Sequence, residues 1–415
     1  MKVLVINAGS SSVKYRLYRM PELTVMANGV VEKIAEEKSE LSHSYNGKTH
    51  SLQTKVEDHE KAMGLILNTL VDKHVGVIKS ISEIDSVGHR VVHGGEEFTG
   101  SVVIDKKVIA SIEKFTDLAP LHNPHNLTGI KAAKKKLPNA KQVACFDTAF
   151  HTTIPKVAYL YALDYELYQK YRIRRYGFHG TSHRYVARRI AQIMGKHKYN
   201  INAITCHLGN GCSITAIKDG KSVDTSMGFT PLEGLVMGTR SGDFDPAVLF
   251  YLVDKGYDLK TLKALCNKKS GLLGISGLSN DMRNLLRDAE SGNDRAKLAV
   301  DMFVYRIKKY IGAYTTVLGR VDALAFAGGI GENAWQIRAQ ICEGLDSIGI
   351  QLDSKENQNA KDKELLISSP DSTVKVFVVP TNEEAAIAAD TYQLTCNKRS
   401  QCHQNNHTEI LQKSK

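Results

Sequence analysis

The feature that most constrains the fold is a strand–turn–strand unit that occurs twice, about 200 residues apart. Residues 2–7 (KVLVIN) form an apolar run that ends at Asn7-Ala8-Gly9, and residues 12–18 then alternate as a returning strand. Residues 202–207 (NAITCH), the turn Gly209-Asn210-Gly211 and the alternating residues 212–217 repeat this order, with Gly209 in register with Gly9. Glycine permits tight turns, and period-two alternation is typical of strands. We therefore predict two similarly built halves with a cleft between them, a favoured position for a ligand.

Later segments alternate short strands with helices. Residues 321–326 (VDALAF) lead through a glycine-rich stretch to a helix from about Asn333, and residues 374–379 (VKVFVV) lead into EEAAIAADTYQL. Thr381 and Glu384 have the spacing of a capping box, which predicts a helix that starts at Thr381. This alternation favours an α/β fold. The polar, unpatterned residues 398–415 are predicted to be disordered.

Composition excludes several classes. A chain of 415 residues, 42% apolar and 24% charged, is typical of a soluble globular protein with two or three domains. No stretch approaches the roughly 18 apolar residues of a membrane span, and the N-terminal apolar run is too short for a signal peptide. Seven scattered cysteines without a C-x-x-C pair indicate a reducing compartment, so we expect a cytoplasmic protein. The net charge of +11 leaves nucleic-acid binding as an alternative, but dispersed basic residues favour small anionic substrates.

Two glycine- or serine-rich turns are candidates for phosphate binding. In Asn7–Lys14 (NAGSSSVK), backbone amides, hydroxyls and a lysine can surround an anion, although a plain hairpin turn is the alternative and no Walker A loop is present. Residues 327–333 (AGGIGEN) lie between a strand and a helix, where phosphate or ribose contacts are common. Because G-x-G-x-x-G is incomplete there, a Rossmann site is disfavoured.

Histidines and arginines stand in apolar or glycine-rich contexts at residues 88–95 (GHRVVHGG), 120–124 (PLHNP), 176–183 (YGFHGTSH) and 238–243 (GTRSGD). Arg90 and Arg240 are each flanked by glycines, and Arg90 also has a histidine on either side, which together indicate an anion clamp. His179 and His183 have the i,i+4 spacing of a zinc pair, but no glutamate lies between them. Asp147 follows a strand, and Glu383 lies in the first turn of the last helix, where stabilisation of the helix dipole is the simpler interpretation.

Nine segments, in this order, together resemble the acetate kinase family: INAGSSSVKY, GHRVVHGGE, LHNPHN, FDTAFH, YGFHGTSH, HLGNGCS, PLEGLVMGTRSGDFDP, GGIGEN and TNEEAAIA. The resemblance covers residues 1 to about 395. It implies two ribonuclease H-like domains with a duplicated core, an actin-like ATPase fold with an interdomain cleft, and a homodimer. The implied domains are residues 1–149 plus 384–397, with the last helix returning to the first domain, and residues 150–383.

The resemblance also implies roles for individual residues. It makes Asn7 and Glu383 the metal site, for Mg²⁺ or alternatively Mn²⁺. The catalytic set is Arg90, His122, Asp147, His179 and Arg240, and the acyl pocket is Arg90, Val92, Leu121, Phe178 and Pro231. The implied ATP contacts are Ser10, Ser12, Lys14, His207, Leu208, Gly209, Asn210, Gly211, Asp281, Met282, Arg283, Gly328, Gly329, Ile330, Gly331 and Glu332.

The implied activity is reversible transfer of a phosphoryl group from ATP to acetate, which gives acetyl phosphate and ADP. Carboxyl groups ionise near pH 4, so acetate needs no general base at pH 7, and we expect Asp147 mainly to orient a neighbouring group. A branched Val92 favours acetate over propionate, with a short-chain carboxylate kinase as the alternative. A nucleotide-driven protein of the actin or chaperone kind is a further alternative; neither nucleic acid nor a membrane is an expected partner.

Overall fold

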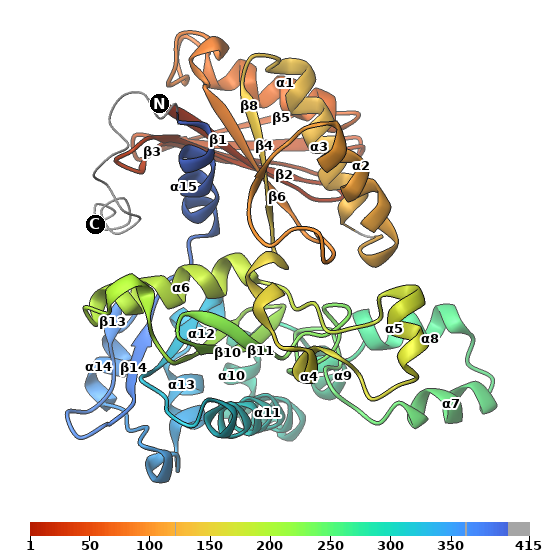
Figure 1. Ribbon diagram of the computed structural model, residues 1–415, viewed down its shortest axis with the longest axis vertical. Helices are drawn as coiled ribbons and strands as arrows, with labels where there is room; N and C mark the ends of the chain where they lie inside the picture. Colours follow the sequence, from red (N-terminus) through yellow and green to blue (C-terminus); the bar gives the residue numbers. More distant parts are fainter. Residues whose placement is uncertain (121, 362, 397–415) are drawn as a thin grey trace. The chain divides into compact units, whose positions relative to one another are not determined.

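The computed structural model describes residues 1–120, 122–361 and 363–396 (Figure 1). The chain divides into two compact units. Unit 1 is Met1–Ala149 with the described part of Asn382–Lys415, and unit 2 is Phe150–Thr381. The sequence placed the return to the first domain at residue 384, two residues later than this division. The predicted disordered tail, residues 398–415, lies outside the described residues.

Unit 1 contains an eight-stranded sheet with the order β5-β4-β3-β2-β1-β6-β8-β7. Strands β1 to β5 form an antiparallel meander, and β1, β6 and β8 are parallel neighbours. The strands are β1 (Lys2–Ala8), β2 (Val13–Arg19), β3 (Thr24–Glu32), β4 (Ser39–Tyr45), β5 (Lys48–Thr54), β6 (Ser86–Val91), β7 (Val102–Val103) and β8 (Lys141–Phe146). Parallel neighbours end at the same sheet edge, so residues that follow β1, β6 and β8 are brought together.

Helices cover both faces of this sheet. Its helices are α1 (His59–Leu70), α2 (Lys106–Lys114), α3 (Asn123–Lys136) and α15 (Glu383–Thr395), with 3₁₀ turns η1 (Ile81–Glu83) and η2 (Phe115–Leu118). Helices α1 and α3 enclose the apolar core with Leu4 and Ile6 of β1. Helix α15, from the end of the described chain, packs on β1, β6 and β8 (Figure 1, blue among red and orange strands). A Cβ at Gly88 would lie 2.4 Å from Thr391 Oγ1, so a glycine is needed where α15 crosses β6.

The predicted helix start at Thr381 is wrong. Helix α15 begins at Glu383, and the side chain of Asn382 is its N-cap, accepting from the amide of Ala385 at 3.0 Å. The Thr381 hydroxyl instead lies 2.7 Å from the Ser182 hydroxyl, a contact across 199 residues. The spacing of Thr381 and Glu384 suggested a capping box, but the Thr381 hydroxyl forms a hydrogen bond with Ser182 instead of capping the helix.

Unit 2 repeats the core of unit 1. Its six-stranded sheet has the order β11-β10-β9-β12-β14-β13, with strands β9 (Ala203–Leu208), β10 (Cys212–Lys218), β11 (Lys221–Thr225), β12 (Ala323–Ala327), β13 (Leu365–Leu366) and β14 (Lys375–Val378). In both sheets the first three strands are antiparallel and the first, fourth and fifth core strands are parallel. The β1–β2 hairpin thus corresponds to the β9–β10 hairpin, and the predicted α/β class and duplicated core are confirmed.

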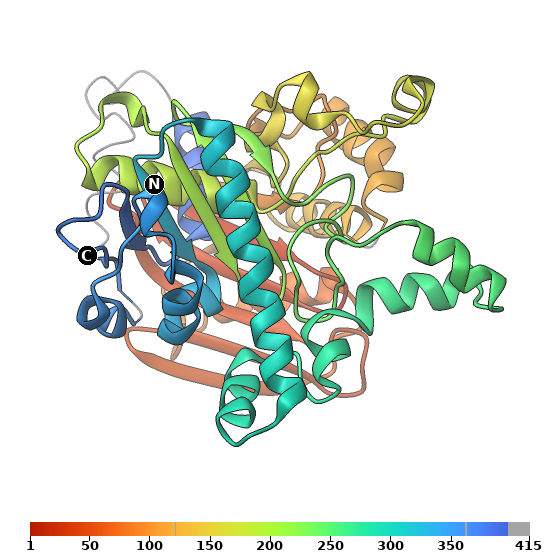
Figure 2. The same ribbon diagram turned by 90° about the horizontal axis from the view of Figure 1, so that it is seen from below.

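The helices of unit 2 mostly follow β11 and precede β14 in the sequence. They are α4 (Lys156–Tyr159), α5 (Tyr165–Tyr171), α6 (Gly180–Ile193), α7 (Ala247–Asp254), α8 (Leu259–Lys268), α9 (Gly271–Ser276), α10 (Met282–Glu290), α11 (Asp294–Leu318), α12 (Gly328–Asn333), α13 (Trp335–Cys342) and α14 (Ser354–Asn359), with 3₁₀ turns η3 (Ala149–Thr153), η4 (His197–Tyr199) and η5 (Asp346–Ile348). The long α11 packs along β10 (Figure 2, teal), and α6 packs on β9 and β12. The glycine-rich stretch expected to precede a helix is itself helix α12. None of the helices in the described parts of the chain combines the length and apolar character that crossing a membrane requires.

Candidate active site

In unit 1, three predicted site residues stand at the carboxyl edge of adjacent parallel strands. Asn7 lies near the end of β1, Arg90 near the end of β6, and Asp147 directly after β8. The amide of Asp147 donates to the Val91 carbonyl at 3.0 Å, which extends the strand pairing by one residue. Strand topology therefore brings together residues that are 57 and 83 positions apart in the chain.

Arg90 and Asp147 form a two-pronged ion pair. Arg90 Nη2 donates to Asp147 Oδ2 at 2.7 Å, and Arg90 Nε donates to the same oxygen at 3.0 Å. The Asp147 side chain is 2% exposed and that of Arg90 25%, so the aspartate is buried behind the guanidinium. The negative charge of Asp147 raises the pKa of Arg90. This geometry fixes the plane of the arginine, which is what binding a carboxylate or phosphate requires.

Glu383, the first residue of α15, lies beside this pair. Its carboxylate is 3.7 Å from Arg90 Nε. Burial raises the pKa of Glu383 to about 7, Arg90 and Lys14 oppose that rise, and the negative charges of Asp147 and Glu384 add to it. The nearby cations therefore do not compensate the burial of this charge. A divalent cation would do so, and oxygen donors such as Glu383 and the amide of Asn7 are ligands that Mg²⁺ accepts, with water and phosphate completing its shell.

Sequence reasoning missed the residues that hold the start of α15. Arg16 Nη1 and the Tyr18 hydroxyl both donate to Oδ1 of Asn382, each at 3.4 Å. They thereby place the N-cap of the helix that carries Glu383. The alternation in β2 puts Arg16 and Tyr18 on the same face as Lys14, and that local signal could have identified them.

The turn after β1 is closed as a hairpin turn and leaves two of the predicted phosphate contacts exposed. The amide of Gly9 donates to the Ser12 carbonyl at 2.8 Å, and His59 Nε2 lies 2.7 Å from the Gly9 carbonyl. Ser10 and Lys14 are exposed, and within the described residues neither side chain has a hydrogen-bond partner. Their donors are therefore open to a ligand from solvent, while Ser12 is half-buried.

His122 and Val92 lie near the same edge. His122 is the N-cap residue of α3 and its side chain makes no capping hydrogen bond. Val92 is 8% exposed and directly follows β6. The third predicted pocket residue of unit 1, Leu121, lies outside the described residues, so the structure describes only Arg90 and Val92 of the pocket residues in this unit.

In unit 2, His179 begins helix α6 in a left-handed conformation, with φ of 55°. Its Nδ1 lies 2.9 Å from the Ser213 hydroxyl, which also lies 2.7 Å from Nε2 of His183. The rings of His179 and His207 are 4.3 Å apart. The two histidines at i,i+4 spacing thus share a hydroxyl group. Among the described residues, no group of three or more His, Cys, Asp or Glu side chains is placed to hold a metal ion.

Arg240 approaches His179 across a glycine. A Cβ at Gly211 would lie 3.6 Å from Arg240 Nη1 and 3.6 Å from His179 Cε1. Arg240 Nη1 donates to the Pro231 carbonyl at 3.2 Å, and burial lowers the pKa of this arginine. Within the described chain it forms no ion pair with a carboxylate. A largely buried guanidinium without a counter-anion, next to a helix N-terminus, is suited to a phosphoryl group.

The predicted nucleotide contacts of unit 2 are three segments, and the segment 207–211 lies next to each of the other two. A Cβ at Gly328, where φ is 75°, would lie 2.7 Å from the Leu208 carbonyl, so the start of α12 packs against the end of β9. Asn280 Nδ2 donates to Asn210 Oδ1 at 2.9 Å, which links the β9–β10 turn to the segment Asp281–Arg283. Phe178 is 3% exposed, and Pro231 lies in the loop of Arg240.

Glu332 has a role that the sequence did not reveal. Its Oε1 accepts from the amides of Gly328 and Thr381, at 2.8 and 3.0 Å. The carboxylate therefore ties the glycine-rich helix α12 to the connection that leads to Asn382 and α15. The signal is long-range, and no local pattern points to it.

Two copies of a five-stranded core, each with a glycine turn between its first two strands, define the class of two-unit α/β proteins with the actin-like ATPase fold. Residues 2–389 match the model of the acetokinase family, and the chain belongs to this family. It is 55% identical over 396 residues to the acetate kinase of Halothermothrix orenii, covering 95% of this chain and 99% of the relative.

Solved structures agree with this assignment. The acetate kinase of Porphyromonas gingivalis has a TM-score of 0.92 and 51% identity, with 95% of this chain and 99% of that chain covered. A propionate kinase from Francisella tularensis has a TM-score of 0.89 and 42% identity at the same coverage of both chains. The match extends over both units.

Proposed function

We propose that this protein is an acetate kinase, which transfers a phosphoryl group reversibly from ATP to acetate and yields acetyl phosphate and ADP. The observation that carries the proposal is Arg240, a largely buried guanidinium that has no carboxylate partner among the described residues and lies near His179 at the start of α6. Family membership supplies the class of reaction, since the relatives at 51–55% identity reported above are acetate kinases.

His179 and Arg240 act on the phosphoryl group in transit. Charge spreads over three equatorial oxygens during this transfer, and preorganised donors that meet that charge lower the barrier. Arg240 supplies a fixed positive charge, and His179, oriented through its Nδ1 by Ser213, supplies a directed donor. His122 would contact the same group from the N-terminus of α3.

Arg90 holds the carboxylate of acetate or the acyl end of acetyl phosphate, and Asp147 holds Arg90. The 2.7 Å bond between Arg90 Nη2 and Asp147 Oδ2 leaves the other terminal nitrogen, Nη1, to meet the substrate. Acetate is already an anion at pH 7 and needs no proton removed. Asp147 is therefore a positioning residue in this proposal rather than a base.

Asn7 and Glu383 would hold Mg²⁺, with Mn²⁺ as the alternative ion. A bound Mg²⁺ would neutralise phosphate oxygens of the nucleotide and lower the repulsion between two anionic substrates. The uncompensated burial of Glu383 supports the assignment. Arg16 and Tyr18 would keep this carboxylate in place through the N-cap Asn382.

The proposed ATP contacts form one set of residues in each unit. In unit 1 the Ser10 hydroxyl, Ser12 and the Lys14 ammonium would meet phosphate oxygens. In unit 2 the remaining contacts are His207–Gly211, Asp281–Arg283 and Gly328–Glu332. Glu332 would act chiefly by holding the backbone amides of Gly328 and Thr381, from which its carboxylate accepts.

Acetate is the preferred acid in this proposal, with propionate as the alternative. Val92, Leu121, Phe178 and Pro231 would form the acyl pocket. A branched valine narrows the space for a longer chain, although one methylene changes selectivity by only about 1–3 kcal/mol. The similarity to the propionate kinase of Francisella tularensis, at 42% identity, is the reason for retaining propionate as the alternative substrate.

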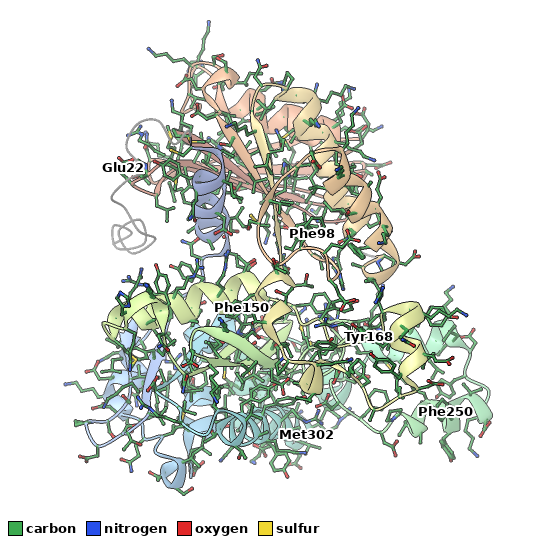
Figure 3. The ribbon with its side chains drawn as sticks, in the orientation of Figure 1. Glu22, Phe98, Phe150, Tyr168, Phe250 and Met302 are labelled. Carbon is green, nitrogen blue, oxygen red and sulfur yellow. The ribbon has the colours of Figure 1, made fainter. Side chains whose placement is uncertain are left out.

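A homodimer is part of the proposal, and helix α7 supports it. Phe250 is 71% exposed, Tyr251 60% and Val253 55%, and none of the eight residues of α7 is buried. Figure 3 shows Phe250 on α7, far from the sheet of unit 2. An exposed apolar helix of this kind marks an interaction surface, and a second copy of the chain is the partner that the family resemblance implies. Residence in the cytoplasm is likewise proposed; no disulfide bond joins any of the six cysteines in the described residues.

The test is formation of acetyl phosphate from ATP and acetate, trapped as its hydroxamate, with and without magnesium. We expect product that requires both acetate and the metal. ATP hydrolysis at a rate that acetate does not change would favour a nucleotide-driven protein of the actin or chaperone kind and refute the proposal.

A further inference from the structure

The carboxamide of Asn126, in the first turns of α3, is buried and uses both of its ends. The side chain belongs to a residue that is 4% exposed. Its Oδ1 accepts from the Val92 amide at 3.1 Å, and its Nδ2 donates to the Ala8 carbonyl at 2.9 Å. A carbonyl oxygen must face the N–H and an amino group must face the C=O, so these partners fix the orientation of the amide.

The two backbone groups belong to the two loops that the proposed reaction uses. Ala8 is the last residue of β1, immediately before the turn with Gly9 and Ser10, and Val92 is the first residue after β6. The parallel pairing of these strands runs from Val3 with Ser86 to Ile6 with His89 and then stops. Asn126 therefore connects the ends of β1 and β6, beyond the last residues at which the two strands pair with each other.

Helix α3 is shaped to bring this amide into place. A Cβ at Gly129, one turn after Asn126, would lie 2.7 Å from the Cβ of Ala8. That distance is too short for two carbon atoms, so the helix can approach the end of β1 only because residue 129 is a glycine. Two residues on one face of α3, Asn126 and Gly129, thus contact Ala8 at the end of β1.

We propose that Asn126 is a positioning residue that sets the separation between the phosphate turn after β1 and Val92, and thereby the selectivity for acyl chain length. This inference rests on the proposed function, because it assigns Val92 to the acyl pocket. A displacement of about 1 Å at a reacting centre can lower the rate about 10²-fold, so a brace between the two loops has a measurable effect.

Asn126→Asp is the sharpest perturbation. The acid keeps the size of the amide and the acceptor for the Val92 amide, but it turns an oxygen toward the Ala8 carbonyl, where two acceptors repel. We expect kcat with acetate to fall about 10- to 100-fold. We also expect the ratio of kcat/KM for acetate to that for propionate to fall at least about threefold, since repulsion from the Ala8 carbonyl displaces the side chain of residue 126 and Val92 with it.

Gln142→Glu is the matched control. Gln142 is also 4% exposed, and its amide bonds to the Ala140 carbonyl and to His89, away from Ala8 and Val92. Both substitutions exchange a buried amide for an acid of the same shape. The control should lower the melting temperature and leave the acetate-to-propionate ratio within about twofold of the native value, because it touches neither loop.

The experiment measures both acids and the melting temperature in Asn126→Asp, Val92→Ala, the double variant and Gln142→Glu. If Asn126 acts through Val92, the double variant has the ratio of Val92→Ala alone. A native ratio in Asn126→Asp, with a loss of stability like that of the control, would reduce Asn126 to a structural residue. A full shift that persists in the Val92→Ala background would refute the route through Val92.

Asn126→Ser provides a second variant if the aspartate protein does not fold, because a hydroxyl can keep one of the two bonds. It should shift the ratio in the same direction by a smaller factor, and an unchanged ratio overturns the inference. A native protein that forms no acyl phosphate with either acid refutes the proposed function itself. The assay on the native protein therefore distinguishes a failure of the proposed function from a failure of the positioning role of Asn126.

Discussion

Replacing Asp147 with asparagine tests what the buried carboxylate does. The substitution keeps the shape of the side chain and removes its charge. In the native structure Asp147 receives two donors of Arg90, and its side chain is 2% exposed. An amide can accept one of these bonds, but its amino group would face the other donor. Arg90 would then be drawn toward Glu383, which already lies 3.7 Å from its Nε.

The magnitude follows from burial. Breaking a buried ion pair by removing one partner costs about 3–5 kcal/mol. Arg90 is 25% exposed and keeps Glu383 nearby, so we take about 2–3 kcal/mol as the loss of correct orientation. At about 1.36 kcal/mol for each factor of ten, kcat/KM for acetate should fall about 30- to 150-fold. The pH profile should keep its shape, because an ionised acetate gives Asp147 no proton to remove.

The assay is acetyl phosphate formation by the native protein, Asp147→Asn, Arg90→Ala and the double variant. If Asp147 acts only by orienting Arg90, the double variant is no slower than Arg90→Ala. Losses that simply multiply would show that Asp147 acts on the reaction independently. Turnover of Asp147→Asn close to the native rate would show that orienting Arg90 is unimportant.

Four further predictions follow from particular residues. Arg240→Ala should lower kcat at least about 10²-fold with little change in KM for ATP, because its charge meets the transferring group; an equal effect on both would make it a nucleotide-binding residue. Val92→Ala should shift kcat/KM toward propionate, and an unchanged ratio removes this valine from the acyl pocket. Burial lowers the pKa of His89 to about 4, so the unfolded chain binds the proton first as pH falls below about 6.5, and stability is lost. At pH 5.5 this loss is about 1.4 kcal/mol, and urea denaturation of His89→Gln at pH 7.5 and 5.5 should show a correspondingly smaller difference; an equal difference would contradict the assignment. Phe250→Glu should yield monomers by light scattering, whereas an unchanged mass would place the dimer contact elsewhere.

Much of the fold could be predicted because its signals are local. The strand–turn–strand repeat around Gly9 and Gly209 is visible in alternation and in one glycine of each turn, and both sheets have the same core order. Boundaries were less certain where two residues compete for one role. Thr381 and Asn382 can both cap a helix, and the choice depends on Ser182, which is 199 residues from Thr381.

Within the site, the sequence indicated which residues take part but not which residues they form hydrogen bonds or ion pairs with. The sequence singled out Arg90 and Asp147 separately, yet their pairing requires β6 and β8 to be neighbours. The i,i+4 spacing of His179 and His183 is that of a zinc pair, which the absence of an intervening glutamate disfavoured, and in the structure both histidines lie within hydrogen-bond distance of the Ser213 hydroxyl. Asn126 had no signal of its own, since its partners are 34 and 118 residues away. Long-range hydrogen bonds are the part of a site that single-sequence patterns do not encode.

The returning helix α15 has a consequence for synthesis of the chain. Unit 2 is continuous, from Phe150 to Thr381, whereas unit 1 needs both Met1–Ala149 and the helix that begins at Glu383. On the ribosome, the first 149 residues therefore emerge without the helix that covers one face of β1, β6 and β8. That face stays open while the whole of unit 2 is translated, and the nascent chain acquires Glu383 only with the segment that closes it.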